Sequence, residues 1–528
     1  MDIYRLTTDA PALPAHARSV AIGVFDGVHR AHREVIGQVL DTGYVPTVLS
    51  FAGSPLQLPK QAPALETPRR KAALLERLGV RELIELDFAE FRTLSPADFV
   101  TDVLCHRLNA KTVACGEDFR FGLGGAGNVQ TLRSLCEPLG IRVEVVPTVY
   151  DNGQVVSSSR IRELIATGDM QEANRLLGHP YIIETAVIDG NHLGRTVGFP
   201  TVNQPLPEDV VPPAFGVYAS TVVVDGRSYI GVTNIGRKPT VGSEKPLAET
   251  WIVGYEGDLY GQTLTLCPVK FLRPEQIFST IETLFAQVAA DAEAIQLLYR
   301  PTGKVQAVLF DFDDTLHSRV EAWRAFSLSF VRELFPELPE DRCRQRAHEL
   351  WELGGRGHGY GDDFRDIPYQ VLFGELKNRW QLPQSVEQLI ERCHPLFALH
   401  TAVFADAADT LRRLRATGYK VGIITNGRSF LQNRKLAVSG LLPLLDCAVV
   451  AGDEGVSKPN AELFIRTAYR LGVPPQDCVY VGDNPVADIA GATAAGMRAV
   501  YIDRTGEGYA VPPEVPTIHT LDELDPIL

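Results

Sequence analysis

Apolar runs of strand length alternate with amphipathic stretches of helical period over the first 180 residues. Runs rich in Val, Ile and Phe, typical of buried strands, lie at 19–27, 44–51, 84–88, 110–119 and 142–150. Stretches in which apolar positions recur every three or four residues lie at 31–40, 68–80 and 159–169. This alternation predicts a Rossmann-like α/β domain with a parallel, doubly wound sheet over residues 1–180.

The pattern changes between residues 181 and 303. Short β-rich runs cut by Gly and Asp turns lie at 179–190, 216–235, 248–257 and 262–272. They predict a small antiparallel β-barrel. An amphipathic helix is expected to close this domain over 274–298, and RPTGKV at 300–305 has the composition of a linker.

Alternation of strand and helix returns in residues 304–528. Apolar runs of strand length lie at 307–312, 420–427, 478–483 and 497–503. A long helical block at about 317–400 separates the first run from the second, and we expect it to form a helical cap on a second Rossmann-like domain. The chain is thus an α/β multidomain protein with three cores, as 528 residues would suggest.

Composition narrows the function classes. The chain has 51 Lys and Arg against 65 Asp and Glu, a net charge of −14, and no basic run, which excludes a general nucleic-acid binder. No apolar segment approaches bilayer length or resembles a signal peptide, so a cytoplasmic protein without membrane contact is expected. The 8 Cys form no C-x-x-C pair and are expected to be small buried hydrophobes.

Two histidines mark the first candidate site. His29 and His32 begin the helix that follows the first predicted strand, and residues three apart share a helix face. The free amides and the dipole of a helix N-terminus attract anions, so this turn is a candidate phosphate site. Its remaining expected binding residues are Gly23, Phe25 and Asp26.

The turn resembles the HxGH-type nucleotidyltransferases, specifically the FMN adenylyltransferase half of the bacterial bifunctional riboflavin kinases/FAD synthetases. GEDFRFG at 116–122 and SSSRIR at 157–162 match further segments of that family. The resemblance implies catalytic roles for His29, His32 and Arg160, with ATP and FMN as substrates and FAD as product. The binding residues it implies are Gly116, Asp118, Phe119, Phe121, Ser157 and Ser158. Phe119 and Phe121 are equally expected to be core residues.

Two positions depart from that family. Ala31 stands where the family has a second Gly, and the segment from Ser50 to Pro55, including Ala52, lacks the family's acidic residue. Because backbone approaches phosphate closely at such a glycine, Ala31 puts FAD synthesis in question. The alternative is a domain that only docks nucleotide or flavin.

The middle domain has no Walker-type phosphate loop, yet GNHLGRTVGFPTVN at 190–203 combines flexible glycines with oxygen ligands. Gly190 and Gly194 suit a loop over phosphates or, equally, a barrel corner. Thr201 and Asn203 suit Mg²⁺ or Mn²⁺. With 216–220, 234–240 and 248–261, the segment resembles riboflavin kinases. That resemblance implies nucleotide binding by Arg195 and a base, Glu249, that deprotonates the ribityl hydroxyl attacking the γ-phosphate of ATP.

Carboxylates follow the first strand of the last domain. Asp311 and Asp313 lie two apart at the carboxyl end of a predicted parallel strand, where a ligand crevice is expected. One carboxylate there can attack phosphorus while the other transfers a proton. Later segments add a hydroxyl, an amide, a cation and metal-binding carboxylates: Thr425, Asn426, Lys458, Asp483 and Asp488.

This set resembles the haloacid dehalogenase superfamily of phosphatases, which implies that Asp311, Asp313, Asp483 and Asp488 hold the metal. We therefore expect a multifunctional enzyme that makes FMN and FAD and carries a Mg²⁺-dependent phosphatase with small-molecule substrates. The phosphatase substrate is expected to be FMN or the phosphoribitylamino-pyrimidine precursor of riboflavin, with the precursor favoured because hydrolysis of FMN would form a futile cycle. The alternative is a riboflavin kinase with a degenerate first domain and a general sugar-phosphate phosphatase. Oligomeric state is left open.

Overall fold

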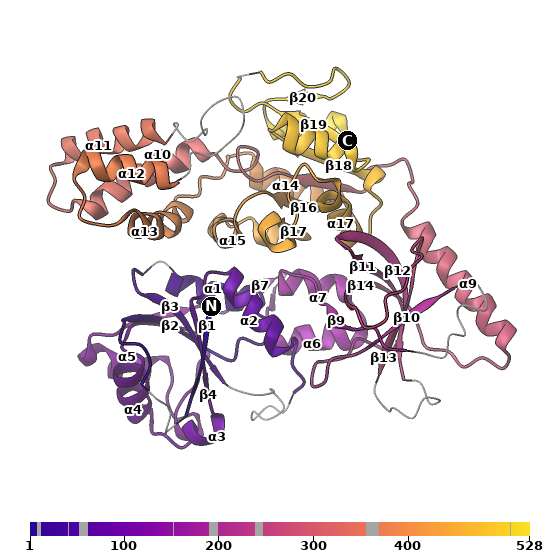
Figure 1. Cartoon of the computed structure of the whole chain (residues 1–528), viewed down its shortest axis with the longest axis horizontal. Coiled ribbons are helices and arrows are strands. Elements are labelled where there is room, and N and C mark those ends of the chain that lie inside the picture. The colour runs from indigo at the N-terminus through magenta and orange to yellow at the C-terminus, as the bar shows by residue number, and fades with distance from the viewer. Residues whose placement is uncertain are drawn as a thin grey trace.

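The computed structural model describes residues 1–7, 12–40, 42–51, 62–151, 153–189, 199–237, 246–354, 369–506 and 508–528. Three modules follow one another along the chain. Figure 1 shows the first module and the barrel side by side, with the third module lying across both of them. The three predicted fold classes are confirmed.

The first module is built on a parallel six-stranded sheet in the order β1-β4-β3-β2-β5-β6. Its strands are β1 (Asp2–Leu6), β2 (Arg18–Ile22), β3 (Val45–Phe51), β4 (Glu82–Leu86), β5 (Ala110–Gly116) and β6 (Arg142–Val146). The chain runs outward from β2 to β3 and β4 on one side and to β5 and β6 on the other. A ligand crevice is expected where strand order reverses in this way, at the carboxyl ends of β2 and β5.

Helices cover both faces of this sheet. They are α1 (Arg30–Leu40), α2 (Pro68–Arg77), α3 (Phe88–Phe91), α4 (Pro96–Asp98), α5 (Val129–Cys136), α6 (Ser158–Thr167) and α7 (Met170–Leu177), with a π-helical segment at Phe99–Arg107 and a small hairpin of β7 (Tyr150–Asp151) and β8 (Gln154–Val155). Side chains of α6 and α7 share one apolar core with the barrel. The first two modules are therefore packed together rather than merely linked.

The second module is an antiparallel sheet in the order β10-β13-β12-β11-β14-β9. Its strands are β9 (Ile183–Ala186), β10 (Thr201–Pro205), β11 (Gly216–Val224), β12 (Arg227–Gly236), β13 (Leu247–Ile252) and β14 (Thr263–Pro274). A bridge between Ile188 and Asn203 brings the two edges together, so the barrel is nearly closed. Asp225 and Gly226, both at positive φ, form the two-residue turn of the β11–β12 hairpin.

The closing helix, α9 (Ile281–Leu298), begins seven residues later than the predicted start at 274. Pro274 instead ends β14, where it pairs with Gly216, and Thr280 caps the helix. The hydrophobic pattern could not place this boundary because Thr280, a strong N-cap residue, lies inside the predicted segment.

The third module has a parallel six-stranded sheet in the order β17-β16-β15-β18-β19-β20. Its strands are β15 (Ala307–Phe310), β16 (Lys420–Thr425), β17 (Cys447–Val450), β18 (Cys478–Gly482), β19 (Arg498–Ile502) and β20 (Thr517–Ile518). β15 lies at the centre with β16 and β18 on either side. Residues that follow these three strands therefore meet at one edge.

Two groups of helices complete this module. The cap consists of α10 (Arg319–Leu334), α11 (Glu340–Leu353), α12 (Tyr369–Trp380) and α13 (Val386–Leu399), which enclose a separate aromatic core. Helices α14 (Ala407–Ala416), α15 (Ser429–Val438), α16 (Ala451–Glu454), α17 (Ala461–Leu471) and α18 (Gly491–Ala494) cover the sheet. The predicted helical block between β15 and β16 is confirmed as a cap standing to one side (Figure 1).

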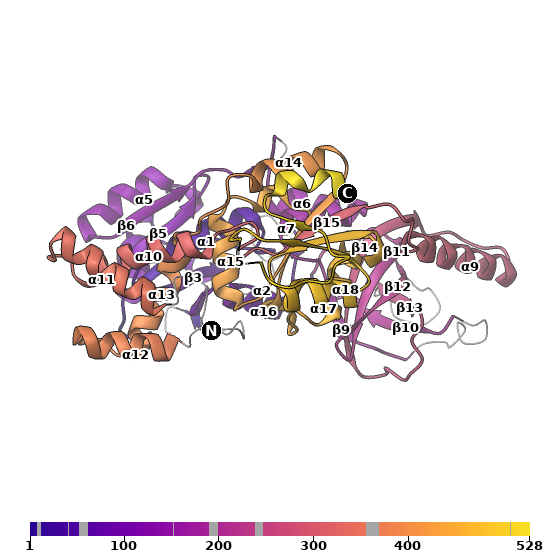
Figure 2. The same ribbon diagram turned by 90° about the horizontal axis from the view of Figure 1, so that it is seen from above.

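The third module contacts the first through α15, which packs against α1 (Figure 2) and begins beside the end of α2. Gly79 lies under the ring of Phe430, and a Cβ there would come within 2.2 Å of that ring. The φ of Gly79, 98°, also disfavours any other residue. Ser429 Oγ donates to the carbonyl of Arg77 at 3.1 Å. This interface requires glycine at position 79.

The third module contacts the barrel through α17. The backbone N–H of Ser228 donates to Glu462 at 2.8 Å, and Arg466 donates to the carbonyl of Gly226 at 3.0 Å. Tyr299 OH, at the end of α9, donates to the carbonyl of Tyr469. The third module is thus held by both of its neighbours.

All eight cysteines are free, six of them buried and two half-buried, as expected for small apolar residues. Among the described residues, no helix has both the length and the apolar character required to cross a bilayer.

Candidate active sites

The histidine pair lies at the carboxyl end of β2, in the crevice where strand order reverses. Residues 23–29 form a tight loop between β2 and α1, and Phe25 and Val28 take positive φ of 51° and 38°. Such backbone strain in non-glycine residues clusters at functional sites. The rings of His29 and His32 stack at 3.5 Å between centroids, and Phe25 packs edge-on against His32. The structure therefore brings both predicted histidines together on a strained loop.

Both imidazoles are neutral in this environment. Burial lowers the pKa of His29 to about 3 and that of His32 well below its ordinary value, and the nearby cations Lys71 and Arg162 lower the latter further. The backbone N–H of His32 donates to His29 Nδ1 at 3.4 Å, so the proton of His29 is on Nε2. His32 Nδ1 is buried and has no hydrogen-bond partner in the part of the chain that the structure describes. The pair offers N–H donors to an anion instead of positive charge.

Acidification is expected to destabilise the fold through this pair. An unfolded histidine takes up a proton near pH 6.5, whereas the folded site keeps His29 neutral down to about 3. The unfolded state binds more protons between these two pH values. The free energy of unfolding therefore decreases as the pH is lowered, by at most about 1.4 kcal/mol per pH unit for each such group. Urea denaturation at about pH 7 and about pH 5 measures this loss. The double variant His29→Asn/His32→Asn should lose less stability than the wild type; an equal loss would refute the assignment.

Several predicted nucleotide-binding residues also organise the loops around the pair. Asp26 accepts from the backbone N–H of Leu65 at 2.8 Å and from the guanidinium of Arg162. Ser158 Oγ donates to the carbonyl of Asp26, and Ser157 caps α6. The backbone N–H of Gly23 bonds to Leu49, and a side chain at Gly23 would press on Phe25. These contacts place the start of α6 beside the histidine loop.

Arg160 is tethered to Glu172 at 3.0 Å, and its Nη1 is buried with no hydrogen-bond partner among the described residues. One nitrogen of this guanidinium therefore remains available to a ligand. Arg162, two residues further on, acts electrostatically on both histidines, because its charge contributes to the lowered pKa of each.

The segment after β5 brings Gly116 and Asp118 to the same edge of the sheet. Phe119 and Phe121 stack at 5.6 Å, but Phe121 is 6% exposed and also packs on Phe99 in the core. Phe121 is therefore a core residue here, the second of the two roles expected for it. Phe119 is half-buried, so it is the more accessible of the two rings.

Sequence reasoning missed Lys71. Its Nζ donates to the carbonyl of Val24 and to Ser50 Oγ, both at 2.6 Å, at the carboxyl ends of β2 and β3. Burial lowers its pKa to about 8. The signal lay in the basic run Arg69, Arg70, Lys71 in the first turn of α2, where the helix dipole disfavours cations unless something else holds them.

The predicted kinase residues lie on one face of three neighbouring strands. Asn203 on β10 and Asn234 on β12 both pair directly with Glu249 on β13. Residues directly opposite in antiparallel strands share a face, and Thr201 lies on the same face two residues from Asn203. Asn203 Oδ1 is buried and has no hydrogen-bond partner among the described residues. The structure therefore places Thr201, Asn203 and Glu249 on one face of the sheet. The side-chain oxygen of Asn203 could bind a ligand there.

Glu275, just after β14, was not singled out from the sequence. Burial raises its pKa, an effect that Glu249 nearby increases and a hydrogen bond from Asn234 opposes. Its position in FLRPEQ, directly after the long strand, was the available signal. Gly190, Gly194 and Arg195 lie outside the described residues, as do Ala52 and residues 238–245.

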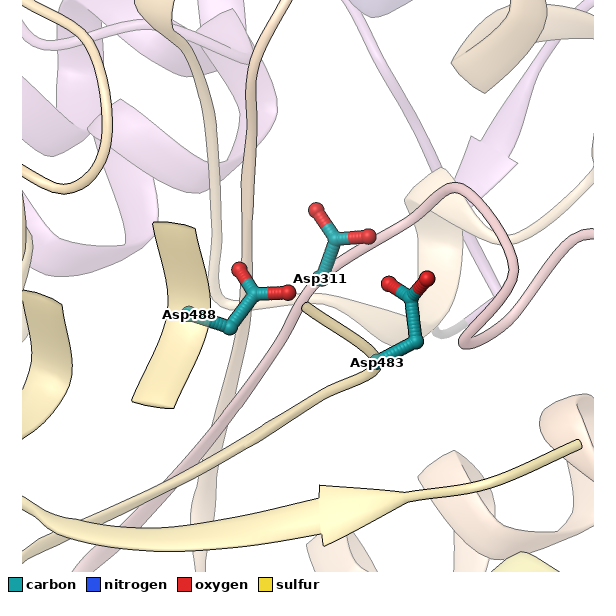
Figure 3. Close-up of side chains that lie close together, drawn as sticks. All are labelled: Asp311, Asp483 and Asp488. Carbon is teal, nitrogen blue, oxygen red and sulfur yellow. The ribbon is translucent and has the colours of Figure 1, made fainter. Parts of the chain in front are cut away.

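The hydrolase module gathers its carboxylates at the edge where β15, β16 and β18 end. The ligand atoms of Asp311, Asp483 and Asp488 all lie within 4.8 Å of one another (Figure 3). The amine of Lys458 bonds to Asp311, to Asp488 at 2.6 Å and to Tyr480 OH at 3.1 Å. One lysine therefore links the expected nucleophile to a carboxylate of the expected metal site.

Asn426 positions this lysine from the end of β16. Its Oδ1 accepts from the backbone N–H of Lys458 at 2.9 Å, and its Nδ2 donates to the Lys458 carbonyl at 3.0 Å. Thr425, buried at the end of β16, lies beside it. Gly482 allows the close approach of Asp488, because a Cβ there would lie 2.5 Å from the carboxyl carbon.

Asp313 lies apart from the three clustered carboxylates and is held by α15. Lys435 forms an ion pair with it, and Gln432 Nε2 donates to it at 2.6 Å. Burial alone would raise the pKa of Asp313, but Lys435, His317 and Arg319 outweigh it, and the pKa is lowered. Sequence reasoning missed Gln432 and Lys435, although two polar residues three apart after ITNG share one face of a helix.

The donor set of the three clustered carboxylates fits an oxygen-seeking divalent cation. Burial and the neighbouring Asp311 and Asp488 raise the pKa of Asp483 well above its ordinary value. Burial and the neighbouring Asp488 and Asp313 raise the pKa of Asp311 to about 7, although Lys458 acts in the opposite direction. Lys458 contacts Asp311 and Asp488 of the three carboxylates. A divalent cation would relieve the remaining repulsion and keep all three ionised.

Comparisons with known proteins divide along the same modules. Family models match for FAD synthetase at residues 13–160, riboflavin kinase at 177–299 and haloacid dehalogenase-like hydrolase at 305–496. The bifunctional riboflavin kinase/FMN adenylyltransferase of Pseudomonas fluorescens is 37% identical over 298 residues, 55% of this chain and 96% of that protein. The Escherichia coli (strain K12) protein of the same description is 36% identical over 300 residues, with the same coverage. A crystal structure described as a macrolide-efflux protein from Streptococcus pneumoniae aligns with a TM-score of 0.51 and 29% identity over 56% of this chain and 98% of that one.

Proposed function

The chain belongs, over its N-terminal part, to the family of bifunctional riboflavin kinases/FMN adenylyltransferases, and from this we propose that it makes FMN and FAD and hydrolyses a phosphomonoester of the same pathway. A haloacid dehalogenase-like hydrolase domain follows in the same chain. We place the boundaries between the three modules at about residues 180 and 303. The observation that carries its last part is the packing of the hydrolase module against both flavin modules through α15 and α17.

For the kinase, Glu249 takes the proton of the ribityl hydroxyl as that oxygen attacks the γ-phosphate of ATP. Support comes from the alignment of Glu249 with Asn203 and Asn234 across the sheet. Thr201 and Asn203 would hold Mg²⁺, which neutralises phosphate charge when bound. Glu275, whose own pKa is raised by burial and by Glu249, adds a second carboxyl group beside this base.

For the adenylyltransferase, the phosphate of FMN attacks the α-phosphorus of ATP, and pyrophosphate leaves. His29 and His32 donate N–H groups to the oxygens on which charge develops. Ala31 is compatible with this role, since its methyl group packs against the apolar core shared with the barrel. The match to the FAD synthetase family over residues 13–160 favours FAD synthesis over a domain that only docks nucleotide.

For the phosphatase, Asp311 attacks phosphorus and forms an aspartyl phosphate while the alcohol leaves. The alcohol takes its proton from Asp313, which can carry one only when substrate displaces Lys435, the ion-pair partner that lowers its pKa. Asp313 then takes a proton from the water that hydrolyses the intermediate. Lys458 offsets the charge of the transferred group. Asp311, Asp483 and Asp488 would hold Mg²⁺, which supplies further charge neutralisation when bound.

We assign the phosphoribitylamino-pyrimidine precursor of riboflavin as the substrate of this phosphatase. A module packed against a kinase that makes FMN would cancel its product if it hydrolysed FMN. Hydrolysis of the precursor instead feeds the same sequence of reactions. The cap packs through α13 against α15, the helix that holds Asp313, and is the element expected to select the substrate.

Phosphate release by the full chain tests this assignment. With Mg²⁺ present, kcat/KM for the pyrimidine precursor is expected to exceed that for FMN and for a panel of sugar phosphates by at least about tenfold, the effect of about 1.4 kcal/mol. The same preparation given FMN, ATP and Mg²⁺ should make FAD, which shows that the other modules are folded. Equal rates across the panel would overturn the pathway assignment and favour a general phosphatase. A preference for FMN would overturn the precursor alone.

A further inference from the structure

A cavity of about 630 Å³ lies where the three modules meet. Its walls come from α1, α2 and α7 of the first module, from the barrel strands β9 and β14, and from β17 and α17 of the hydrolase module. None of the residues assigned above to the three active sites lines it. It is therefore a separate space that exists only because the modules are docked.

The residues that line this cavity carry a net positive charge, whereas the chain as a whole is negative. Nine Arg and Lys side chains line it against six Asp and Glu, whereas the chain as a whole has a net charge of −14. Such a concentration of cations in a low-dielectric, walled space attracts anions more strongly than the same charges would in water.

Part of this positive charge is already neutralised. Arg466 and Arg470 pair with Glu454 at 2.9 and 2.6 Å, and Arg175 pairs with Asp151 and Glu172, both at 2.6 Å. These ion pairs form the lower-charge part of the wall.

The guanidinium groups that still have hydrogen-bond donors to offer lie on α1 and α2. Arg70 Nε is buried and has no hydrogen-bond partner among the described residues. Arg33 donates Nε–H to the carbonyl of Val28, and no described carboxylate lies within ion-pair distance of it. Among the described residues, the ion-pair partner of Arg77 is Asp453, with 3.9 Å between Nε and Oδ1. Three guanidinium groups from two adjacent helices thus face the cavity with donors unused.

Electrostatics agrees with the geometry. Burial lowers the pKa of Arg33 to about 10, even though Asp453 and Glu66 act in the opposite direction. Burial also lowers the pKa of Arg70, and Arg77 and Arg470 add to that effect. The carboxylates present do not compensate these cations, so an added anion would stabilise them.

We propose that this cavity binds a diphosphate-bearing anion, either free pyrophosphate or the diphosphate of a nucleotide. Guanidinium groups match phosphate oxygens in paired hydrogen bonds, and three of them suit more than one phosphate group. The volume lies within the range of about 300–1,000 Å³ usual for small-molecule sites. Because the walls belong to three modules, a bound anion also stabilises their docked arrangement.

The test compares Arg70→Gln with Arg69→Gln in the full chain. Arg69 precedes Arg70 on α2, is exposed and does not line the cavity, so it controls for the loss of one positive charge. Isothermal titration with pyrophosphate, ATP, FAD and FMN measures stoichiometry and affinity. For at least one diphosphate-bearing probe, Arg70→Gln should weaken one equivalent by at least tenfold, while Arg69→Gln leaves it unchanged and FMN binding is unaffected by either.

The four probes separate the sources of the diphosphate. Loss of pyrophosphate binding alone identifies the free anion, and loss of FAD or ATP binding identifies a nucleotide. Arg70→Lys, which keeps the charge but not the fork of donors, should give an intermediate affinity, and an unchanged KM for riboflavin shows that the variants are folded. Wild-type stoichiometry and affinity for all four probes in Arg70→Gln would overturn the proposal.

Discussion

Asp311→Asn is expected to lower phosphate release by at least about a thousand-fold, a loss of about 4 kcal/mol of transition-state stabilisation. The amide keeps the shape of the carboxylate but cannot attack phosphorus, and no other carboxylate occupies its place beside Lys458. Asp488 shares that lysine, yet it accepts from the backbone N–H of Asn484 at 3.0 Å and is held away from the attacking position. Steady-state phosphate release from the preferred substrate measures the effect.

Two controls isolate this nucleophile. FMN formation by the same variant should be unchanged, because the kinase residues lie on the barrel. Asp409→Asn, at an exposed position of α14 in the same module, should retain full phosphatase activity. Substantial phosphate release by Asp311→Asn would refute the assigned nucleophile, and loss of both activities would show that the modules do not act independently.

Glu249→Gln is expected to lower the kcat of FMN formation by about 10²- to 10⁴-fold, the usual contribution of a positioned general base. Glutamine preserves the side chain's length and its place opposite Asn203 and Asn234, so the KM for riboflavin should change little. Conversion of riboflavin and ATP to FMN, followed by chromatography, gives both constants.

Phosphatase turnover by Glu249→Gln should equal that of the wild type. Glu256→Gln, an exposed position shortly after β13, is the matched control and should leave kcat unchanged. An undiminished kcat in Glu249→Gln would exclude this residue as the base. A raised KM with the same kcat would make it a binding residue instead.

Local patterns were sufficient where burial made them strong. Apolar runs became the strands β2, β3, β15 and β18, which are four to seven residues long, because strands buried on both faces are largely apolar. β1 was missed because it is an edge strand with three of its five residues exposed, and its sequence, DIYRL, has charged residues that interrupt the apolar run. The start of α9 was misplaced because capping, a matter of one side chain, decides a helix boundary more than periodicity does.

The sequence by itself determined the three fold classes and the order of the modules, and it singled out most of the candidate site residues, because these depend on short stretches with strong local signals. It could not bring Lys435 to Asp313, separated by more than a hundred residues, nor align Asn203 with Glu249 across paired strands. The arginine-lined cavity, with walls running from Arg30 to Leu471, belongs to no single module. Such features arise only when separate elements pack, because ion pairing, strand register and enclosure depend on distances in space rather than on separation along the chain.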